Sequence, residues 1–521
     1  MLTQTLNPTD TITVGLGPVS FDEVVAVARH DARVQIHPDA LAEVRRTRAV
    51  VEALADDPQP HYGVSTGFGA LATRHIPVAM RTQLQRSLIR SHAAGSGPEV
   101  EREVVRALML LRLSTLTTGR TGVRDVVAQT YADLLNAGIT PVVHEYGSLG
   151  CSGDLAPLAH CALAIIGEGT VRDQHGILQP AAEALAVAGI TPVVLAEKEG
   201  LALINGTDGM LGMLVLALTD LRTLVTTADI TAAMSVEGQL GTDDVFAEDL
   251  HLLRPHPGQL ATAANLRKIM AGSEIRESHR TNDCTRVQDA YSLRCSPQVA
   301  GGARDTMAHA RTVAEIELAS AIDNPVVTLD GRVESNGNFH GAPIAYVLDF
   351  LAIVVADLAS IAERRTDRFL DPARSQGLNP FLADDPGVDS GHMIAQYTQA
   401  AIVSELKRLA APASVDSIPS SAMQEDHVSM GWSAARKLRR AVDGLTRVLA
   451  IELLTAARGI ELRTPLTPSP TTGAVIAALR AAGAPAPGPD RWLAPEIETA
   501  VTFVSSGGAV TAAESVTGPL Q

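Results

Sequence analysis

The amino-acid sequence predicts a mainly α-helical protein in which an N-terminal globular region is followed by a bundle of long helices. Aromatic residues are only 3% of the 521 residues, whereas alanine, leucine and valine are abundant, and this composition favours helices over sheets. From Asp208 onward the sequence contains long stretches with few helix breakers. The longest expected helix, 426–458, exceeds the usual length in globular proteins, which indicates a bundle or a core shared between subunits. We therefore expect an N-terminal domain at residues 1–207 and a long-helix bundle with a C-terminal helical region at residues 208–521.

The N-terminal part is expected to begin with a short strand at 11–14. Ser20 and Glu23 then have the spacing of a capping box, which predicts a helix over 21–29. The sequence His37-Pro-Asp predicts the start of a second helix, because apolar residues spaced for one helix face follow it. Another helix is expected to start near Asp154, and further helices are expected at 80–92, 99–117 and 179–188.

The second part contains the long helices, for which the clearest ranges are 208–237, 303–321, 342–367, 390–409 and 426–458. The most apolar long stretch, 341–362, contains Asp349 and Asp357. Because a charge at the centre of a bilayer is costly, we interpret this stretch as a buried helix of the bundle and expect no membrane span.

The charge balance and the cysteines limit the classes of protein to which this chain can belong. The chain has 58 acidic and 42 basic residues, a net charge of −16, which argues against a nucleic-acid partner because such proteins usually carry a basic patch. The N-terminus lacks the basic and apolar regions of a signal peptide. No cysteine or histidine cluster has zinc-site spacing, so no metal is expected. The few cysteines, without Cys-x-x-Cys spacing, indicate a reduced, cytoplasmic setting: Cys151, Cys161, Cys284 and Cys295.

The segment from Gly147 to His160 holds the candidate reactive group, the tripeptide Cys151-Ser152-Gly153. Glycine lacks Cβ and tolerates tight backbone conformations, so the amide nitrogen of Gly153 can be pressed against the carbonyl carbon of Cys151. If that attack closes a five-membered ring, loss of water at the old carbonyl and from the Ser152 side chain leaves an exocyclic methylene. This group would be an electrophile made from the backbone. The alternative is an ordinary glycine-rich turn before a helix.

This fourteen-residue segment resembles the signature of the aromatic amino acid ammonia-lyases, above all those that act on histidine. The resemblance implies a 4-methylidene-imidazole-5-one (MIO) group that forms autocatalytically from Cys151, Ser152 and Gly153, with no external cofactor. The commonest form of the signature is Ala-Ser-Gly. Because the first residue gives only its carbonyl to the ring, cysteine at position 151 is expected to be tolerated.

A glycine-rich loop at residues 62–69 is also similar to the family. There the tyrosine faces the substrate, which makes Tyr62 the favoured base for removing the β-proton, provided that its pKa is lowered from the ordinary phenol value of about 10. The same loop contains Gly63-Val-Ser-Thr-Gly67, a Gly-x-Ser-x-Gly match that makes a serine hydrolase the competing enzyme class. That motif needs a strand before the serine and a helix after it, and the proline-rich residues before this loop disfavour it.

Two further motifs point to an imidazole substrate. The family places a histidine at the position of His92 when the substrate is histidine, whereas lyases acting on tyrosine or phenylalanine resemble His-Leu or Phe-Leu there. The sequence Gln424-Glu-Asp-His resembles the histidine-specific members. The Glu425 carboxylate can accept the ring N–H of the substrate or hold its charged form. The resemblance therefore assigns His92 and Glu425 to the imidazole.

Five more residues complete the expected site. The amide of Asn205 can donate to a carboxylate or to the carbonyl of the electrophile. Gln288, Tyr291 and Arg294 are spaced i, i+3 and i+6, so they drift slowly around one face if this stretch is helical. Arg294 could clamp the substrate carboxylate bidentately, and Tyr291 could act as a second acid/base or orienting phenol. In the family, the phenylalanine at position 339 packs near the MIO ring.

The resemblance implies a carbon–nitrogen lyase that eliminates ammonia from L-histidine to give trans-urocanate, the first step of histidine degradation. Tyr62, Ser152, Tyr291 and Glu425 are the implied catalytic residues, with Glu425 the second candidate base. The family forms homotetramers whose active sites take residues from more than one subunit, and its helical bundle is comparable to that of the fumarase/aspartase superfamily. Two alternatives remain: an ammonia-lyase or 2,3-aminomutase acting on phenylalanine or tyrosine, and a non-catalytic homologue.

Overall fold

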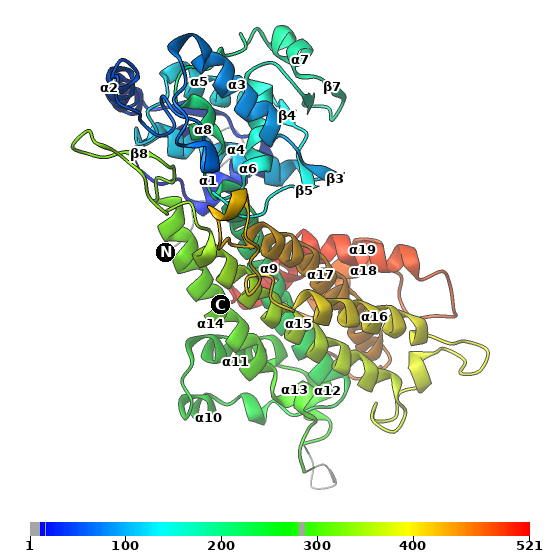
Figure 1. Cartoon of the computed structure of the whole chain (residues 1–521). Coiled ribbons are helices and arrows are strands. Elements are labelled where there is room, and N and C mark those ends of the chain that lie inside the picture. The colour runs from blue at the N-terminus through cyan, green and yellow to red at the C-terminus, as the bar shows by residue number, and fades with distance from the viewer. Residues whose placement is uncertain (1–10, 16, 281–286) are drawn as a thin grey trace. The chain divides into compact units, whose positions relative to one another are not determined.

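A computed structural model describes residues 11–15, 17–280 and 287–521, and it divides into two compact units (Figure 1). Cys284 and the N-terminal residues examined for a signal peptide lie outside the described residues. The first unit, here unit 1, comprises Met1–Leu216, Arg311–Leu348 and Pro412–Arg436. The second, unit 2, comprises Ala217–Ala310, Asp349–Ala411 and Lys437–Gln521. Each unit therefore draws on separate segments of the sequence, and the expected single boundary at residues 207 and 208 stays a prediction.

Unit 1 begins with the strand and the capped helix that the sequence predicts. Strand β1 (Ile12–Val14) pairs in parallel with β2 (Val34–Ile36). Between them, α1 (Phe21–His30) starts at a complete capping box, in which the Ser20 amide donates to the Glu23 carboxylate over 2.7 Å and the Glu23 amide donates to the Ser20 hydroxyl over 3.3 Å. Helix α2 (Pro38–Ala55) begins at its proline, as predicted from His37-Pro-Asp.

Helix α4 (Arg102–Thr117) packs against α1 and α2 in the N-terminal part of unit 1, and its residues from Val104 to Thr117 are all buried. Strand β3 (Ser96–Glu99) pairs antiparallel with β5 (His144–Tyr146), and β4 (Thr140–Pro141), β6 (Thr170–Arg172) and β7 (Leu178–Pro180) form a second antiparallel sheet. The other helices here are α3 (Arg81–His92), α5 (Asp125–Asn136), α6 (Leu155–Ile165), α7 (Ala181–Ala188) and α8 (Glu199–Ile204), with short 3₁₀ turns η1 (Gly69–Leu71) and η2 (Val78–Met80).

Four long helices each contribute residues to both units, and their ranges confirm the predicted helix-rich class. They are α9 (Asp208–Gly238), α14 (Ser296–Leu318), α15 (Ala342–Leu370) and α17 (Gly431–Glu461). Helix α14 starts seven residues earlier than the expected residue 303, and it includes Gly301, where a Cβ would lie 2.4 Å from the backbone of Gln259. A close helix contact therefore explains the glycine. Helix α17 starts at Gly431 instead of 426, because the preceding residues form a loop in which the Ser420 amide donates to the Glu425 carbonyl over 2.8 Å.

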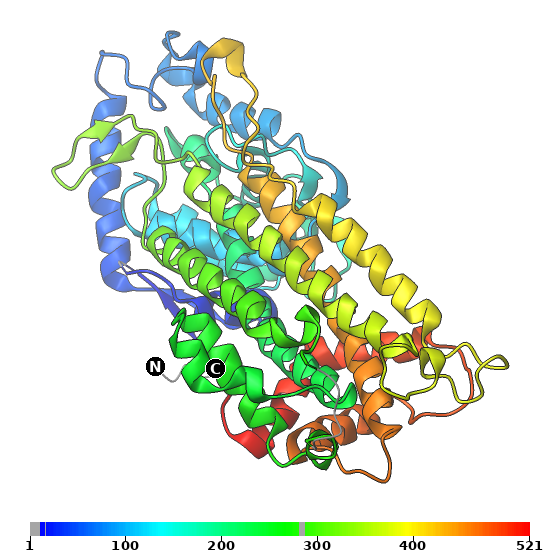
Figure 2. The same cartoon turned by 90° about the horizontal axis from the view of Figure 1, so that it is seen from below.

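Unit 2 is helical, and Figure 2 shows α15, α16 (Met393–Leu409) and α17 lying side by side in it. The Gln399 amide of α16 donates to the Val448 carbonyl of α17 over 2.8 Å. The remaining elements of unit 2 are η3 (Asp244–Phe246), α10 (Glu248–Leu252), α11 (Pro257–Met270), α12 (Glu274–Glu277), α13 (Tyr291–Arg294), η4 (Pro380–Leu382), α18 (Pro470–Ala481), α19 (Ala494–Ser505) and α20 (Gly508–Thr517). Unit 1 also contains β8 (Val326–Val327), its antiparallel partner β9 (Val333–Glu334) and η5 (Ser421–Met423).

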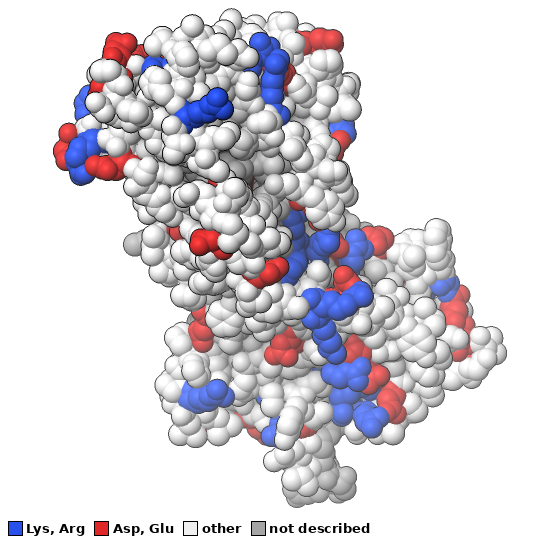
Figure 3. All heavy atoms as spheres, viewed as in Figure 1, with Lys and Arg blue, Asp and Glu red and all other residues white. Residues whose placement is uncertain are grey.

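Two helices, α9 and α15, are long and apolar enough to cross a bilayer, but most residues of their apolar stretches are buried inside the protein. Within α15, Asp349 is buried and forms an ion pair with Lys437 of α17 at 2.5 Å. These are the features of core helices, in agreement with the interpretation of 341–362 as a buried helix. On the face shown in Figure 3, basic and acidic side chains are interspersed.

Candidate active site

The tripeptide Cys151-Ser152-Gly153 lies in a tight turn between β5 and α6 in unit 1. Ser152 has a left-handed φ of 55°, which is uncommon for a residue other than glycine, and Gly153 has a φ of 84°. A Cβ at position 153 would lie 2.0 Å from the carbonyl oxygen of Gly206. Glycine is therefore required at this position, and the turn has two consecutive residues with positive φ.

The Asn205–Gly206 segment, here called the strap, pairs with this turn. The Gly206 amide donates to the Ser152 carbonyl over 3.1 Å, and the Gly206 carbonyl accepts from the Asp154 amide over 2.7 Å. On the other side of the turn, the Gly153 amide donates to the Gly150 carbonyl over 3.3 Å. The turn is thus fixed by backbone hydrogen bonds on both sides, and the residues fit a ring made from the tripeptide.

Asp154, which follows the tripeptide, is a buried carboxyl that the sequence prediction left without a role. One of its oxygens accepts from the Met210 amide over 2.9 Å and the other from the Ser148 hydroxyl over 3.1 Å. Burial raises the pKa of Asp154 to about 7. Its place inside the signature segment was the available signal. A carboxyl of this pKa can exchange a proton near neutral pH.

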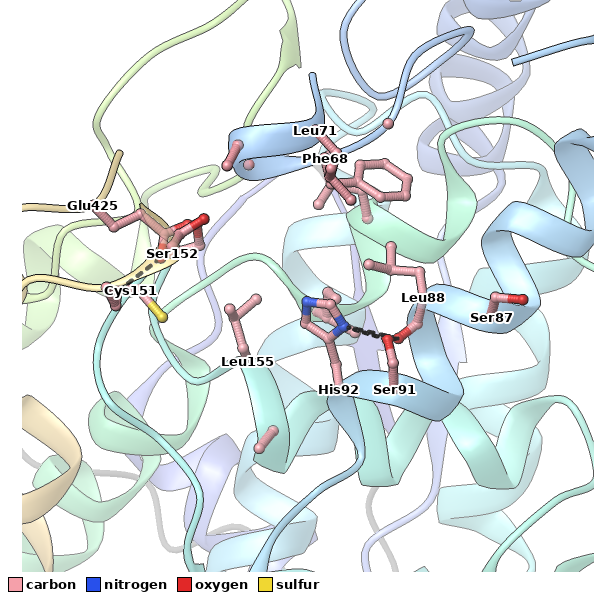
Figure 4. Close-up of a pocket in the computed structure, with 18 of the residues that line it drawn as sticks. Phe68, Leu71, Ser87, Leu88, Ser91, His92, Cys151, Ser152, Leu155 and Glu425 are labelled. Carbon is pink, nitrogen blue, oxygen red and sulfur yellow. Dashed lines mark hydrogen bonds between the residues drawn. The ribbon is translucent and has the colours of Figure 1, made fainter. Parts of the chain in front are cut away.

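A cavity of about 730 Å³ in unit 1 brings together five residues predicted from the sequence (Figure 4). They come from four separate segments and are Tyr62, His92, Cys151, Ser152 and Glu425. Most of the remaining lining is apolar, and includes Phe68, Leu71, Leu88, Leu155 and Leu201. The cavity has the size and the mainly apolar lining of a small-molecule site.

His92, the last residue of α3, has its ring orientation fixed by its own helix. Its Nδ1 lies 2.9 Å from the Leu88 carbonyl oxygen and 3.0 Å from the Ser91 hydroxyl. Because a carbonyl only accepts, Nδ1 carries the proton, and Nε2 is left as an acceptor. Burial lowers the pKa of His92, which favours this neutral form. Figure 4 shows the ring beside the cavity, joined to Ser91 by the dashed line.

Glu425 lies beside Ser152 and Cys151 at the other end of the cavity in Figure 4. Its carboxylate accepts from the Ser420 hydroxyl over 3.0 Å. Ser420 was missed in the sequence, since only its distance of five residues from Glu425 could have indicated it. Burial and the nearby Glu425 carboxylate raise the pKa of the Cys151 thiol to about 11. Cys151 is therefore a protonated thiol at neutral pH and a poor nucleophile toward an electrophile next to it.

Tyr62 lies in a loop that folds back on itself through hydrogen bonds between the Gly67 amide and the Arg74 carbonyl (3.0 Å) and between the Ile76 amide and the Ser65 carbonyl (2.9 Å). Burial raises the pKa of the Tyr62 phenol, so the side chain keeps its proton in this structure. This raised pKa is opposite to the lowered pKa that we expected for a base, and the role of Tyr62 stays a prediction.

The same loop does not provide the context of a serine hydrolase. The helix α2 precedes it where a nucleophile elbow needs a strand. Ser65, the central serine of the motif, is fully buried, and its hydroxyl accepts from the His61 amide over 2.9 Å.

Asn205 and Phe339 belong to unit 1, but neither is among the residues that line the cavity. Asn205 is buried at the end of α8, and its side-chain amide donates to the Asn324 carbonyl over 2.8 Å, while its Oδ1 has no partner among the described residues. Phe339 is half-buried in the loop after β9. The next residue, His340, stacks on His427 with ring centroids 5.6 Å apart.

Gln288, Tyr291 and Arg294 belong to unit 2. Tyr291 and Arg294 are in the one-turn helix α13 and Gln288 precedes it, so the helix on which the i, i+3, i+6 alignment depended does not include Gln288. The Arg294 guanidinium lies 4.6 Å from the centre of the Tyr291 ring, and Tyr291 is 71% exposed. Among the described residues, no group of three or more His, Cys, Asp or Glu side chains could hold a metal ion.

Comparison with known proteins identifies the class to which this fold and this turn belong. The sequence model of the aromatic amino acid lyases matches residues 19–481, and the chain belongs to that family. This result confirms the resemblance found in the sequence. Histidine ammonia-lyase of Streptomyces avermitilis is 68% identical over 98% of this chain and 99% of its own length, and that of Sorangium cellulosum is 48% identical over 96% and 99%.

Solved structures of the family have the same fold. Tyrosine aminomutase from Streptomyces globisporus aligns with a TM-score of 0.92 and 37% identity, over 98% of this chain and 100% of that one. Histidine ammonia-lyase from Trypanosoma cruzi aligns with a TM-score of 0.89 and 36% identity, over 97% and 96%. The predicted architecture, a mainly α-helical chain with a long-helix bundle, is confirmed.

Proposed function

We propose that this chain is a histidine ammonia-lyase, which eliminates ammonia from L-histidine without oxidation and gives trans-urocanate, the first step of histidine degradation. The relatives that are 67–68% identical over 98% of the chain carry that name. The proposed cellular location is the cytoplasm. An ammonia-lyase or an aminomutase for phenylalanine or tyrosine would share the fold and the turn, so the choice of substrate rests on the cavity.

The observation that carries the proposal is the pair of polar groups at the two ends of the apolar cavity. His92 offers an unprotonated Nε2, and Glu425 offers a carboxylate. An imidazole with one N–H and one basic nitrogen can donate to either group, and its protonated form can donate to both. A phenylalanine ring has no donor and would leave the Nε2 of His92 unpaired in an apolar surrounding, which is costly, while Glu425 would keep its bond from Ser420.

The tripeptide Cys151-Ser152-Gly153 is proposed to form the MIO group, and its tight turn, with glycine required at position 153, fits that ring. When formed, this group supplies an electrophile that makes the amine, otherwise a poor leaving group, able to depart. The chain's own residues supply the remaining needs. They bind the imidazole, orient the carboxylate and take a proton from Cβ of the substrate.

Two residues of the cavity can take the β-proton. Tyr62 is the first candidate by its position in the family and Glu425 the second. Because burial raises the pKa of Tyr62, this phenol needs an additional positive group or donor in the complete site before it can act as the base. Glu425 is an acceptor without that requirement, but a base role would compete with its role in binding the imidazole.

The α-carboxylate of the substrate is proposed to be held by Asn205 and Arg294. Gln288 is proposed as a further substrate-binding residue, Tyr291 as an orienting phenol or second acid/base group, and Phe339 as packed near the ring. Gln288, Tyr291 and Arg294 lie in unit 2. We propose a homotetramer in which these residues reach a site of a neighbouring subunit. The exposure of Tyr291, at 71%, supports a role outside its own unit.

The test is ammonia release by the purified protein on L-histidine, L-phenylalanine and L-tyrosine, with ultraviolet detection of the unsaturated acid. We expect turnover of L-histidine alone. Turnover of phenylalanine or tyrosine in place of histidine would refute the assignment of His92 and Glu425 to the imidazole while keeping the family's chemistry. Absence of turnover on all three would refute the proposed reaction.

A further inference from the structure

A fully buried arginine lies behind the strap that holds the tripeptide. Arg112 of α4 has none of its surface exposed, and its Nη1 donates to the carbonyls of Ala202 and Asn205 over 3.0 and 3.1 Å. Its Nε donates to the Asp208 carboxylate over 3.0 Å, and Nη2 pairs with the same oxygen. It therefore joins the end of α8, the strap and the first residue of α9.

The guanidinium packs directly against Gly206, the strap residue that pairs with the tripeptide. A Cβ at position 206 would lie 1.8 Å from Nη2 of Arg112. On its opposite side, Gly206 donates its amide to Ser152 and accepts from Asp154. The strap is thus enclosed between the arginine fork and the turn, and a displacement of the guanidinium is transmitted to the Ser152 carbonyl through a single residue.

A buried ion pair such as Arg112–Asp208 adds little net stability to a fold. Both side chains are almost completely buried, at 0% and 6% exposure, and removing two charges from water is unfavourable. Well-packed apolar residues of similar volume often stabilise a core as well or better. The planar guanidinium instead fixes the positions of its partners, because its donors are rigidly spaced and bind several acceptors at once.

We propose that Arg112, oriented by Asp208, is a positioning residue for formation of the electrophile. This inference rests on the proposed MIO function. In the step concerned, the Gly153 nitrogen forms a bond to the Cys151 carbonyl carbon, and its proton passes to the carbonyl oxygen. That oxygen leaves as water with the Ser152 amide proton, and the Ser152 hydroxyl leaves as a second water with the proton on Cα of Ser152. Two waters are lost, and nothing is oxidised or reduced. By holding the strap, Arg112 keeps the Ser152 carbonyl fixed while the turn closes.

The test is the mass of the purified chain, measured under denaturing conditions, in the native protein and in Arg112→Lys. Lysine keeps the charge but loses the fork. We expect the native chain to be short of two waters and the variant to cyclise on the order of a hundredfold more slowly, as is typical of a displacement of about 1 Å at a reacting group. Folding is followed in parallel by circular dichroism and thermal unfolding.

Arg106→Lys is the matched control. Arg106 lies on the same helix, is also fully buried and also donates to backbone carbonyls, those of Val27 and Leu135 at 2.9 and 3.2 Å, but it does not touch the strap. We expect Arg106→Lys to cyclise at the native rate even if it is less stable. Equal loss of cyclisation in both variants would overturn the proposal, because the effect would then follow stability and not position.

The remaining outcomes also decide the question. If Arg112→Lys does not fold, Asp208→Asn, which keeps the shape of the partner, takes its place, and failure of both to fold would make the pair a general determinant of folding and overturn the specific role. A folded Arg112→Lys that loses two waters at the native rate would also overturn it. A native chain that retains both waters would instead refute the proposed MIO function itself.

Discussion

Replacing His92 with leucine tests the hypothesis that the cavity binds an imidazole. In the structure, the His92 ring is held by Leu88 and Ser91 so that Nε2 remains as the acceptor. Leucine has a similar apolar volume but no acceptor, so an imidazole N–H that pairs with His92 loses its partner. The reacting Cβ of the substrate is not involved in this contact, and the loss falls on ground state and transition state alike.

The size of the effect follows from the burial of the site. A donor left unpaired in a buried position costs about 1–3 kcal/mol. This free energy corresponds to a fall in kcat/KM for L-histidine of roughly 5- to 150-fold. Because the contact is made equally in both states, we expect most of the fall as a rise in KM with a smaller change in kcat. For L-phenylalanine, which has no ring N–H, kcat/KM is expected to stay constant or to rise.

The assay is steady-state ultraviolet detection of the unsaturated acid on both substrates at neutral pH. Burial lowers the pKa of His92, so the ring is a neutral acceptor from about pH 6.5 upward and loses this function as the pH falls through the lowered pKa. Ser87→Ala, on the same helix and also lining the cavity, is the control and should change little. An unchanged kcat/KM for L-histidine in His92→Leu, or an equal fall for both substrates, would refute the reasoning.

Three more predictions concern the tripeptide and the response to acid. Ser152→Ala removes the hydroxyl that leaves as the second water, so we expect loss of nearly all turnover and a chain that loses at most the one water of ring closure; native-like activity would contradict the MIO proposal. Cys151→Ala should keep both activity and the loss of two waters, because position 151 gives only its carbonyl and its thiol, with a pKa of about 11, is protonated at neutral pH; an unprocessed variant would show that the thiol is needed. Burial lowers the pKa of His392 to about 3, so the folded state keeps this ring neutral, whereas the unfolded state binds a proton below about pH 6.5. The free energy of unfolding therefore falls as the pH drops from 6.5 toward 3, and at pH 5 the fall is about 2 kcal/mol. His392→Gln should remove this part of the pH dependence between pH 7 and 5, whereas His175→Gln at an exposed turn should not.

The sequence predicted the helix starts that depend on neighbouring residues alone. The capping box at Ser20 and Glu23 and the proline at the start of α2 fixed two helix starts that the structure confirms. The start of α17 was misplaced because Glu425 lies in a loop closed by contacts with Ser420 and, through Val428, with Ser417, which a helix period does not reveal.

The site was predictable to the extent that it resides in contiguous motifs. Tyr62, His92, Ser152 and Glu425 were each found from a short motif, and the cavity brings them together. Arg112 has no motif, because its function depends on carbonyls at positions 202 and 205, far from it in the chain. A buried arginine in a helix is visible in a sequence only as an exception to the apolar pattern, which does not identify its partners.

The contact between Gly150 and Ser429 makes the turn dependent on a much later part of the chain. A Cβ at Gly150 would lie 1.6 Å from the Ser429 carbonyl, so the two backbones meet with no room between them. Ser429 is synthesised almost 280 residues after Gly150. The turn can therefore reach its final geometry only after residues 412–436 have been made and folded. If the tripeptide forms the proposed MIO group, a chain that lacks residues 412–436 would lack this contact, and we expect it not to form the electrophile.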